Sequence, residues 1–225
     1  MPFFVYKIQS EGIIMSESAA ETKKKILDSA MAEFLEKGFM NASLRTIAAN
    51  AGVTTGAMYR HFKDKDALFC ALVDDAIDAS TKAVMLADVS NHLDLNNVVS
   101  KEHFAEESRH TNELINYIFD NFDAFTLLLT KAAGSTHENF QEEICDLHTK
   151  NCAETFNWMY KNGISKKKVD KMTVHFIAST IINAFLEIIT HKMTKKAAFQ
   201  YIANIEEFTR FGMLHMMGIS CSEEK

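Results

Sequence analysis

The chain has 225 residues, of which 47% are hydrophobic and 24% charged, and its net charge at pH 7 is −6. This composition excludes a disordered chain and suffices for one large or two small domains with a substantial core. No uninterrupted apolar run reaches the ~18 residues that span a bilayer. The N-terminus lacks the pattern of a secretory signal, and the four cysteines form no Cys-x-x-Cys pair. We expect a cytoplasmic protein with no membrane partner.

Helix-breaking residues are scarce. Pro2 is the only proline, and the eight glycines are mostly isolated. Proline inside a helix removes a hydrogen bond and clashes with the preceding turn, so a chain almost free of it favours helices. Few turn signals of the kind that separate strands compete with this interpretation. The sequence predicts an all-α fold.

Residues 1–15 are apolar and show no period, and Met15-Ser16-Glu17-Ser18 reads as a second possible start. Our hypothesis is that translation begins at Met15, since Glu11-Gly12 can be encoded by a purine-rich ribosome-binding sequence. The alternative is an arm that contacts DNA or packs on the first helix. That helix is predicted over residues 21–37, ended by Gly38, with Phe39 anchoring the core. Its inward residues are Ile26, Ala30, Phe34 and Leu35.

Residues 43–62 read as two short helices joined by a tight turn. Ser43 suits an N-cap, and Leu44, Ile47, Ala48 and Ala51 follow at the i, i+3, i+4, i+7 spacing of a buried face. Gly52 falls where the first helix must stop, because glycine accepts the left-handed conformation of a C-terminal cap. Thr54 can cap the second helix. This pattern is typical of a helix-turn-helix, although a corner that only packs has the same pattern.

A family resemblance extends from the first helix to the start of the fourth. The matching residues are Ile26, Leu27, Ala30, Phe34, Gly38-Phe39, Ile47-Ala48, Ala51-Gly52-Val53, Gly56, Met58-Tyr59, His61-Phe62 and Lys65-Asp66-Ala67-Leu68. In order and spacing they resemble the tetracycline-repressor (TetR) family of bacterial transcription regulators. Beyond about Val73 the resemblance rests only on length and helical character.

The resemblance implies a DNA-reading surface on the second short helix and around it. The expected DNA contacts are Arg45, Thr55, Gly56, Ala57, Tyr59, Arg60, His61 and Lys65. Arg60 is the best candidate for reading bases, whereas Tyr59 and Lys65 are expected at phosphates. Met58 and Phe62 should be core. Residues 16–70 carry a balance of +1 and residues 71–225 one of −7, so the acidic part should face away from DNA.

The remaining chain reads as amphipathic helices. Asp64 caps a fourth helix towards Ala87, residues 88–97 form a loop, and further helices cover residues 102–122, 123–133, 137–161, 166–191 and 194–217, with Ser165 as a cap. We expect a possible extension or arm at 1–15, a DNA-binding domain at 16–65 and a helical effector-binding and dimerisation domain at 66–225.

In the TetR family such helices form an effector cavity and a dimer interface, and the resemblance implies a set of residues for each. An effector cavity is expected among Phe104, Tyr117, Phe122, Phe125, Trp158, Met159 and Phe185, and plain core packing is the alternative for each. A four-helix dimer interface is expected from the last two helices, with Phe176, Ile177, Thr180, Ala184, Phe208, Phe211 and Leu214 in its seam. The effector itself should be small and largely apolar or aromatic.

Other chemistry finds little support. Cys145, His148 and Cys152 share one helical face and could bind a metal, but three positions on one helix rarely enclose a tetrahedral ion. Two ordinary buried cysteines are the better interpretation, so we expect no metal and no cofactor. Without a Gly-rich phosphate loop, a Gly-x-Ser-x-Gly elbow or a His-Glu-x-x-His motif, the sequence does not predict an enzyme.

The sequence is thus interpreted as a homodimeric TetR-like repressor. Its partners would be a palindromic double-stranded DNA operator, a small-molecule effector that releases this operator, and a second copy of the chain. One alternative is a regulator or activator that binds DNA constitutively or with a corepressor. A more distant alternative is a helical interaction module in which the corner is inert.

Overall fold

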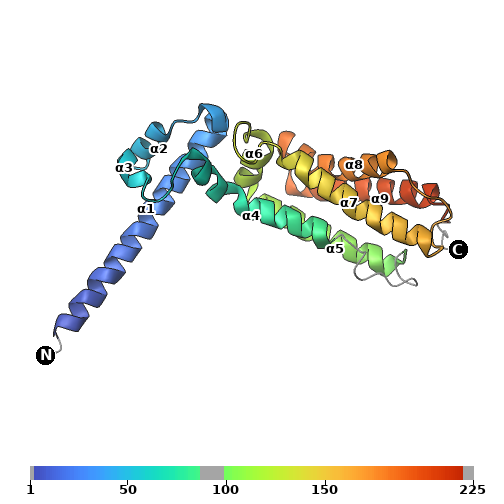
Figure 1. The fold of residues 1–225 in the computed structure, drawn as a ribbon, viewed down its shortest axis with the longest axis horizontal. Coiled ribbons are helices and arrows are strands. Elements are labelled where there is room, and N and C mark those ends of the chain that lie inside the picture. Colours follow the sequence, from blue (N-terminus) through green and yellow to red (C-terminus); the bar gives the residue numbers. More distant parts are fainter. Residues whose placement is uncertain (1–2, 87–98, 220–225) are drawn as a thin grey trace. The chain divides into compact units, whose positions relative to one another are not determined.

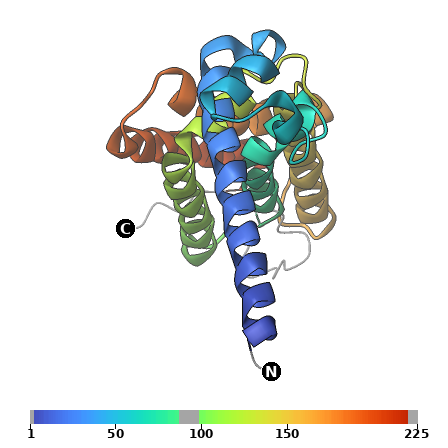
Figure 2. The same cartoon turned by 90° about the vertical axis from the view of Figure 1, so that its left-hand side faces the viewer.

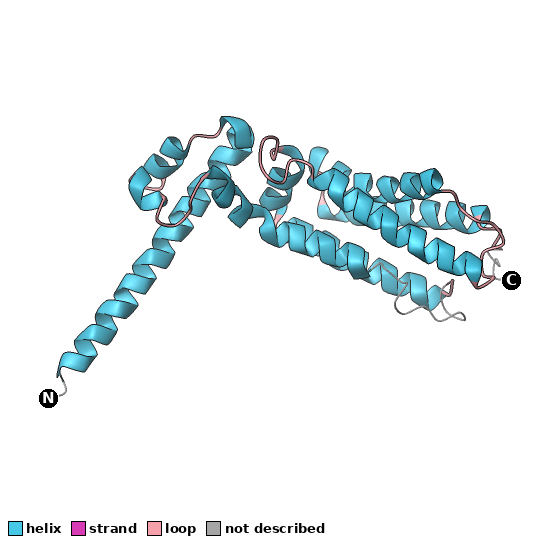
Figure 3. Cartoon of the chain, in the orientation of Figure 1, coloured by secondary structure: helices cyan, strands magenta, loops and turns pink. Residues whose placement is uncertain are grey.

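The computed structural model describes residues 3–86 and 99–219, with side chains from residue 19 onwards. Within these ranges every regular element is a helix, which confirms the predicted all-α class (Figure 3). The helices are α1 (Phe3–Asn41), α2 (Leu44–Asn50), α3 (Thr55–Met58), α4 (Lys65–Leu86), α5 (Lys101–Asp120), α6 (Phe122–Thr130), α7 (Phe140–Lys161), α8 (Lys171–Thr190) and α9 (Lys195–Met216) (Figure 1).

The chain forms two compact units. The first comprises Met1–Asp74 together with Thr130–Glu138, and the second comprises Asp75–Leu129 together with Asn139–Lys225. The first unit therefore continues past residue 65, where the sequence suggested a boundary, and takes in the segment that joins α6 to α7. Helix α4 contributes residues to both units.

The first unit is built on a cluster of aromatic rings. Phe34 and Phe39 stack with their ring centroids 6.0 Å apart, and Phe69 of α4 meets both rings edge-on at 5.3 Å. Gly38 allows this arrangement, since its φ of 72° breaks the helical path of α1 and turns Phe39 inward. Figure 2 shows α2 and α3 at the end of α1 that lies away from the N-terminus. The predicted end of the helix at Gly38 and the predicted burial of Phe39 are confirmed.

The second unit is a helical bundle with two apolar clusters. Helix α8 packs against α7 and α9, and α9 also packs against α5. One cluster contains Phe156, Met159, Val174, Ile177, Leu214 and Met217, and the other contains Ile115, Ala184, Ile188, Ala198 and Ile202. Both clusters draw on α8, so this helix is the central element of the core.

Several predicted element bounds need correction. Helix α1 begins at Phe3 instead of residue 21, and α7 begins at Phe140 because residues 137–139 still belong to the preceding turns. Ser165 caps no helix. It is buried, and its hydroxyl lies 3.3 Å from the carbonyl oxygen of Met217. The cap of α8 is Asp170, whose Oδ1 accepts hydrogen bonds from two backbone amides at 3.0 Å. The predicted loop at 88–97 lies outside the described residues.

Among the described residues, α8 is the one long helix that meets the criteria for a membrane span. By length and composition alone it is apolar enough to cross a membrane, with a mean hydropathy of 1.6. Polar residues interrupt every apolar run in this helix, whereas its average hydropathy stays high. Its buried residues, among them Val174, Ala178 and Ile188, form part of the core of the second unit.

Candidate functional site

The helix-turn-helix has the local geometry that its sequence predicts. The hydroxyl oxygen of Ser43 accepts a hydrogen bond from the Thr46 amide, and that of Thr54 accepts one from the Ala57 amide. Gly52 ends α2 with a φ of 69°, a conformation that costs glycine little. The two caps and the turn fix the start of α3, which is the part of such a helix that meets base edges.

The residues that are expected to contact DNA differ in their exposure to solvent. Gly56, Tyr59 and Arg60 are exposed at α3 and just after it, as is Arg45 on α2, whereas Thr55, Ala57 and His61 are partly buried. Met58 and Phe62, which were predicted as core, are 1% and 5% exposed. Arg45, Gly56, Tyr59 and Arg60 are thus the accessible members of the predicted set, whereas Met58 packs inward.

Lys65 has a second role that the sequence did not reveal. It begins α4, as predicted, but its ammonium donates to the carbonyl oxygens of Met40 at 3.0 Å and Ala42 at 3.3 Å. The same nitrogen lies 4.7 Å from the centroid of the Phe39 ring, which is a cation–π distance. Lys65 therefore satisfies backbone carbonyls that follow the break in α1.

Two further side chains of α1 hold α2 in place, and sequence reasoning did not find either. Glu33 is buried, and its Oε1 accepts a hydrogen bond from the Ser43 amide at 3.0 Å. Ser29 donates its hydroxyl hydrogen to the carbonyl of Ile47 at 2.9 Å. Both lie one turn apart on the inward side of α1. The available signal was a glutamate at a position where the helical period calls for an apolar residue.

The second unit contains a cavity of about 260 Å³. Of the residues proposed to line an effector site, Phe104, Phe125, Met159 and Phe185 line it. The other three predicted residues lie elsewhere. Tyr117 donates its hydroxyl to the carbonyl of Asp75 at 3.4 Å, Phe122 packs on Phe119, and Trp158 packs in the cluster around Met217. All three were aromatic residues on suitable helices but on other faces.

Polar groups interrupt the apolar wall of the cavity. Arg210 lies with its guanidinium carbon 5.0 Å from the centroid of Phe104, and Ser108 donates to Glu206 at 2.9 Å. His103 pairs with Glu107 at 3.4 Å. A largely apolar ligand that carries one or two polar atoms would match this wall, because each polar atom needs a partner when it leaves water.

The pKa values of two histidines that line the cavity are shifted in opposite directions. Burial lowers the pKa of His148, which favours its neutral form, although the charge of Glu107 opposes this effect. The hydrogen bond to Glu107 raises the pKa of His103 despite partial burial. One wall of the cavity thus favours a neutral imidazole and another favours a charged one.

The residues proposed for a dimer seam fall into two groups. Phe176, Phe208 and Phe211 are 65%, 68% and 47% exposed, so α8 and α9 present large apolar side chains outward. Thr180 is partly exposed one turn after Phe176, and its hydroxyl donates to the Phe176 carbonyl. Ile177, Ala184 and Leu214 do not belong to this outer face. They are at most 6% exposed because they pack within the single chain.

The donor atoms of the metal-binding candidate Cys145, His148 and Cys152 do not come together around one point. Cys152 Sγ lies 3.8 Å from His148 Nε2, but among the described residues Cys145 does not bring a third donor to this pair. Burial raises the pKa of the Cys145 thiol, as for an ordinary core cysteine. The trio that does converge in the described part of the chain is Cys70, Asp74 and His137.

Comparison with known proteins finds sequence relatives of the helix-turn-helix region. The family described as bacterial regulatory proteins, tetR family, matches residues 26–72. The transcriptional regulator AcrR of Shigella flexneri is 51% identical over 53 residues, which are 24% of this chain and 25% of AcrR. The transcriptional repressor BepR of Brucella suis is 36% identical over 97 residues, which are 40% of this chain and 46% of BepR. The chain thus matches a quarter to nearly half the length of these relatives.

Solved structures extend the likeness to most of the chain. The TetR family regulator PfmR of Thermus thermophilus has a TM-score of 0.55 at 20% identity and covers 81% of this chain and 97% of its own. The SmeT–triclosan complex has a TM-score of 0.55 at 18% identity, over 86% of this chain and 90% of its own. At these identities the likeness concerns the fold. By sequence the first unit thus matches the TetR family of bacterial regulatory proteins, and the fold of most of the chain resembles that of a solved TetR-family regulator.

Proposed function

We propose that the chain is a cytoplasmic, homodimeric transcription repressor without enzymatic activity. It binds a palindromic operator through α3 and releases the operator when a small, largely apolar molecule enters the cavity of the second unit. The observation that carries this proposal is one chain with both parts: a capped helix-turn-helix with an exposed reading surface, and a mostly apolar cavity of about 260 Å³.

The exposed residues of the helix-turn-helix support the DNA-binding part of this proposal. Arg60 offers a planar fork of donors that suits a guanine edge, and Arg45 and Tyr59 are exposed where phosphates can be reached. Thr55, Gly56, Ala57 and His61 complete the proposed contact set. The name of BepR, a repressor, agrees with this direction of regulation.

The outer face of α8 and α9 supports the dimer. A short reading helix contacts only a few base pairs, so two copies about 34–36 Å apart are needed to occupy successive major grooves. Phe176, Phe208 and Phe211 are large apolar residues that a partner chain would cover. A twofold contact through the same face of both chains gives the palindromic site its symmetry.

Release of the operator requires a difference in affinity. An effector shifts the equilibrium only if it binds the form that does not bind DNA more tightly. Phe104, Phe125, Met159 and Phe185 provide apolar surface for such a molecule, and Arg210 and Glu107 can orient its polar atoms. SmeT was solved with triclosan, an apolar phenol, so we take triclosan as a first probe.

The test begins with selection of an operator. Duplexes bound by the protein are selected from fragmented genomic DNA, and affinity is then measured by fluorescence anisotropy. Arg60→Ala should weaken binding of the selected site by about 1–3 kcal/mol and relax its sequence preference. Lys196→Ala, at an exposed lysine of the second unit, is the matched control and should bind as the parent does. Equal binding by both variants would overturn the assignment of the reading surface.

A second experiment tests the cavity. Triclosan and other small apolar phenols are titrated against the protein–operator complex, and release is expected. Ile181→Trp fills the cavity wall and should abolish the response to the probes. If no apolar probe alters operator affinity while the parent still binds the operator, a constitutive regulator or one that needs a corepressor replaces this proposal.

A further inference from the structure

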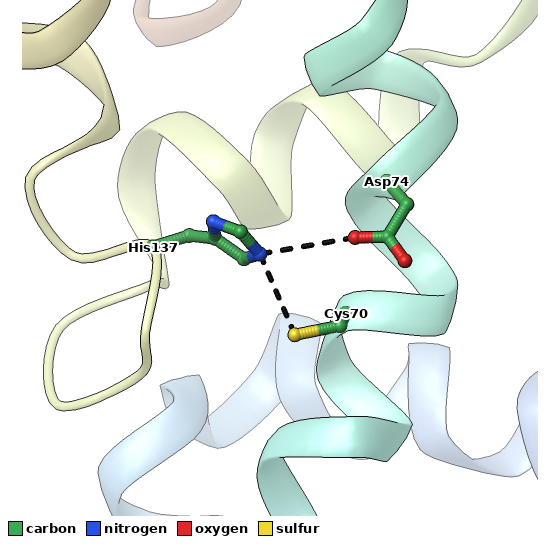
Figure 4. A group of neighbouring side chains, drawn as sticks. All are labelled: Cys70, Asp74 and His137. Atoms are coloured by element: carbon green, nitrogen blue, oxygen red, sulfur yellow. Dashed lines mark hydrogen bonds and ion pairs between the residues drawn. The ribbon is translucent and has the colours of Figure 1, made fainter.

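Three potential metal ligands from distant parts of the sequence meet in the first unit. Cys70 and Asp74 lie one turn apart on α4, and His137 comes from the segment between α6 and α7 (Figure 4). The Nε2 atom of His137 lies 3.4 Å from the Sγ atom of Cys70 and 3.8 Å from Oδ1 of Asp74. All three donor atoms lie within 4.8 Å of one another.

The separation of His137 from Cys70 matches that of two ligands around one small cation. With metal–ligand distances near 2.0–2.3 Å, the donor atoms of a tetrahedral zinc site lie roughly 3.4–3.6 Å apart. Asp74 would have to move closer to both partners, and its side chain is exposed enough to do so. Three protein ligands would leave the fourth position of the ion to water.

The segment that carries His137 is fixed on α4 by other contacts. Oδ1 of Asp66 accepts a hydrogen bond from the Thr136 amide at 2.8 Å, and Oδ2 accepts one from the Thr136 hydroxyl. The His137 amide donates to the hydroxyl oxygen of Ser135 at 3.1 Å. The imidazole is therefore held beside Cys70 by groups that are not themselves ligands. In metal sites, such surrounding groups commonly orient the ligands.

The charges around the thiol favour a cation. The carboxylates of Asp66 and Asp74 both lie near the Cys70 thiol, with Oδ2 of Asp66 3.7 Å from Sγ. A thiolate beside two carboxylates needs a positive partner, and a cation with high affinity for sulfur supplies it. Magnesium and calcium prefer oxygen ligands, whereas a thiolate, an imidazole and a carboxylate suit zinc and similar ions.

We propose that Cys70, Asp74 and His137 bind a zinc-like divalent cation and that this cation ties the segment Thr130–Glu138 to α4 within the first unit. On binding, the thiol proton of Cys70 is released to solvent and no redox change occurs. This site is separate from the reading surface and from the cavity. Its test therefore needs neither an operator nor an effector.

The experiment uses Co²⁺ as a spectroscopic substitute on the full-length protein, purified with chelator and reductant. One equivalent of Co²⁺ per chain should produce a thiolate-to-cobalt charge-transfer band, and Zn²⁺ should abolish it by displacement. Mg²⁺ should leave the band unchanged. The melting temperature should rise with Zn²⁺, because a ligand that binds only the folded state stabilises it.

Variants assign the band to individual residues. Cys70→Ser should abolish it, and His137→Gln and Asp74→Asn should weaken Zn²⁺ binding by at least about a hundredfold. Cys152→Ser, at a second thiol of the described residues that lies near a histidine, is the matched control and should keep the band. Circular dichroism confirms that each variant is folded. If folded parent protein gives no band, or if the band survives Cys70→Ser, the proposal is wrong and the three side chains form only a hydrogen bond and an ion pair.

Discussion

The carboxylate of Glu33 accepts a hydrogen bond from the backbone amide of Ser43, with Oε1 and N 3.0 Å apart. Glu33 is 7% exposed and Ser43 is partly buried, so the contact is largely shielded from solvent. Ser43 in turn caps α2 through its own hydroxyl. A side chain of α1 thus fixes the residue from which the helix-turn-helix starts.

Loss of this acceptor should destabilise the first unit. Glu33→Ala leaves the partly buried Ser43 amide without this acceptor, and the free energy of unfolding should fall by about 1–3 kcal/mol. Glu33→Gln keeps an acceptor oxygen and should lose less. Chemical denaturation of the two variants, with the exposed Glu36→Ala as control, measures the difference. Equal losses for Ala and Gln would mean that packing, and not the hydrogen bond, is important here.

Lys65 should contribute to both stability and DNA binding. Its ammonium has three hydrogens, and the carbonyls of Met40 and Ala42 account for two. Lys65→Ala should lower the melting temperature and also make the salt dependence of operator binding shallower by about one unit of slope. Arg45→Ala should reduce the slope by a similar amount without lowering the melting temperature, since Arg45 is exposed. A lower melting temperature with an unchanged slope would restrict Lys65 to the structural role.

The outer face of α8 and α9 should control the oligomeric state. Phe208 is 68% exposed, and Phe208→Glu would place a charge in an apolar interface between two chains. Sedimentation should change from dimer to monomer, and affinity for the full operator should fall at least about tenfold because half-sites are then bound separately. Tyr160→Glu, at an exposed aromatic residue of α7, should remain dimeric. A dimeric Phe208→Glu protein would exclude this face.

Stability should depend on pH through two histidines of the cavity, with opposite signs. Burial lowers the pKa of His148 below its value of 6.5 in the unfolded chain, so the unfolded state takes up protons first as the pH falls. The contribution of His148 is therefore present above about pH 6.5 and is lost below it. His148→Gln should flatten the decrease in melting temperature between pH 7 and 5.

The same measurement of melting temperature against pH tests His103, for which the opposite effect is expected. The hydrogen bond to Glu107 raises its pKa, so its stabilising contribution is present below 6.5 and is lost as the pH rises through the folded value. His103→Gln should consequently make the decrease towards low pH steeper. If both substitutions change the pH dependence in the same direction, the assignment of a neutral His148 is incorrect.

Local sequence was sufficient to predict the helix-turn-helix. The caps at Ser43 and Thr54, the left-handed Gly52 and the cap of α4 at Asp64 each depend on residues within a few positions along the chain. Hydrogen bonds to the first amides of a helix are made by neighbours in sequence, so the pattern of residue types contains the information. The all-α class followed from the near absence of proline and the apolar spacing.

Only the tertiary structure decided which side of a helix meets which partner. Cys70 and His137 are 67 positions apart, and Glu33 replaces an apolar residue because Ser43 lies opposite it. Ile177 and Phe176 are adjacent in sequence, yet one is core and the other is exposed. Helices α8 and α9 carry large apolar residues on exposed as well as buried positions, so periodicity alone cannot distinguish core, cavity wall and outer face in them. Packing between distant helices makes that distinction, and no short stretch of sequence records it.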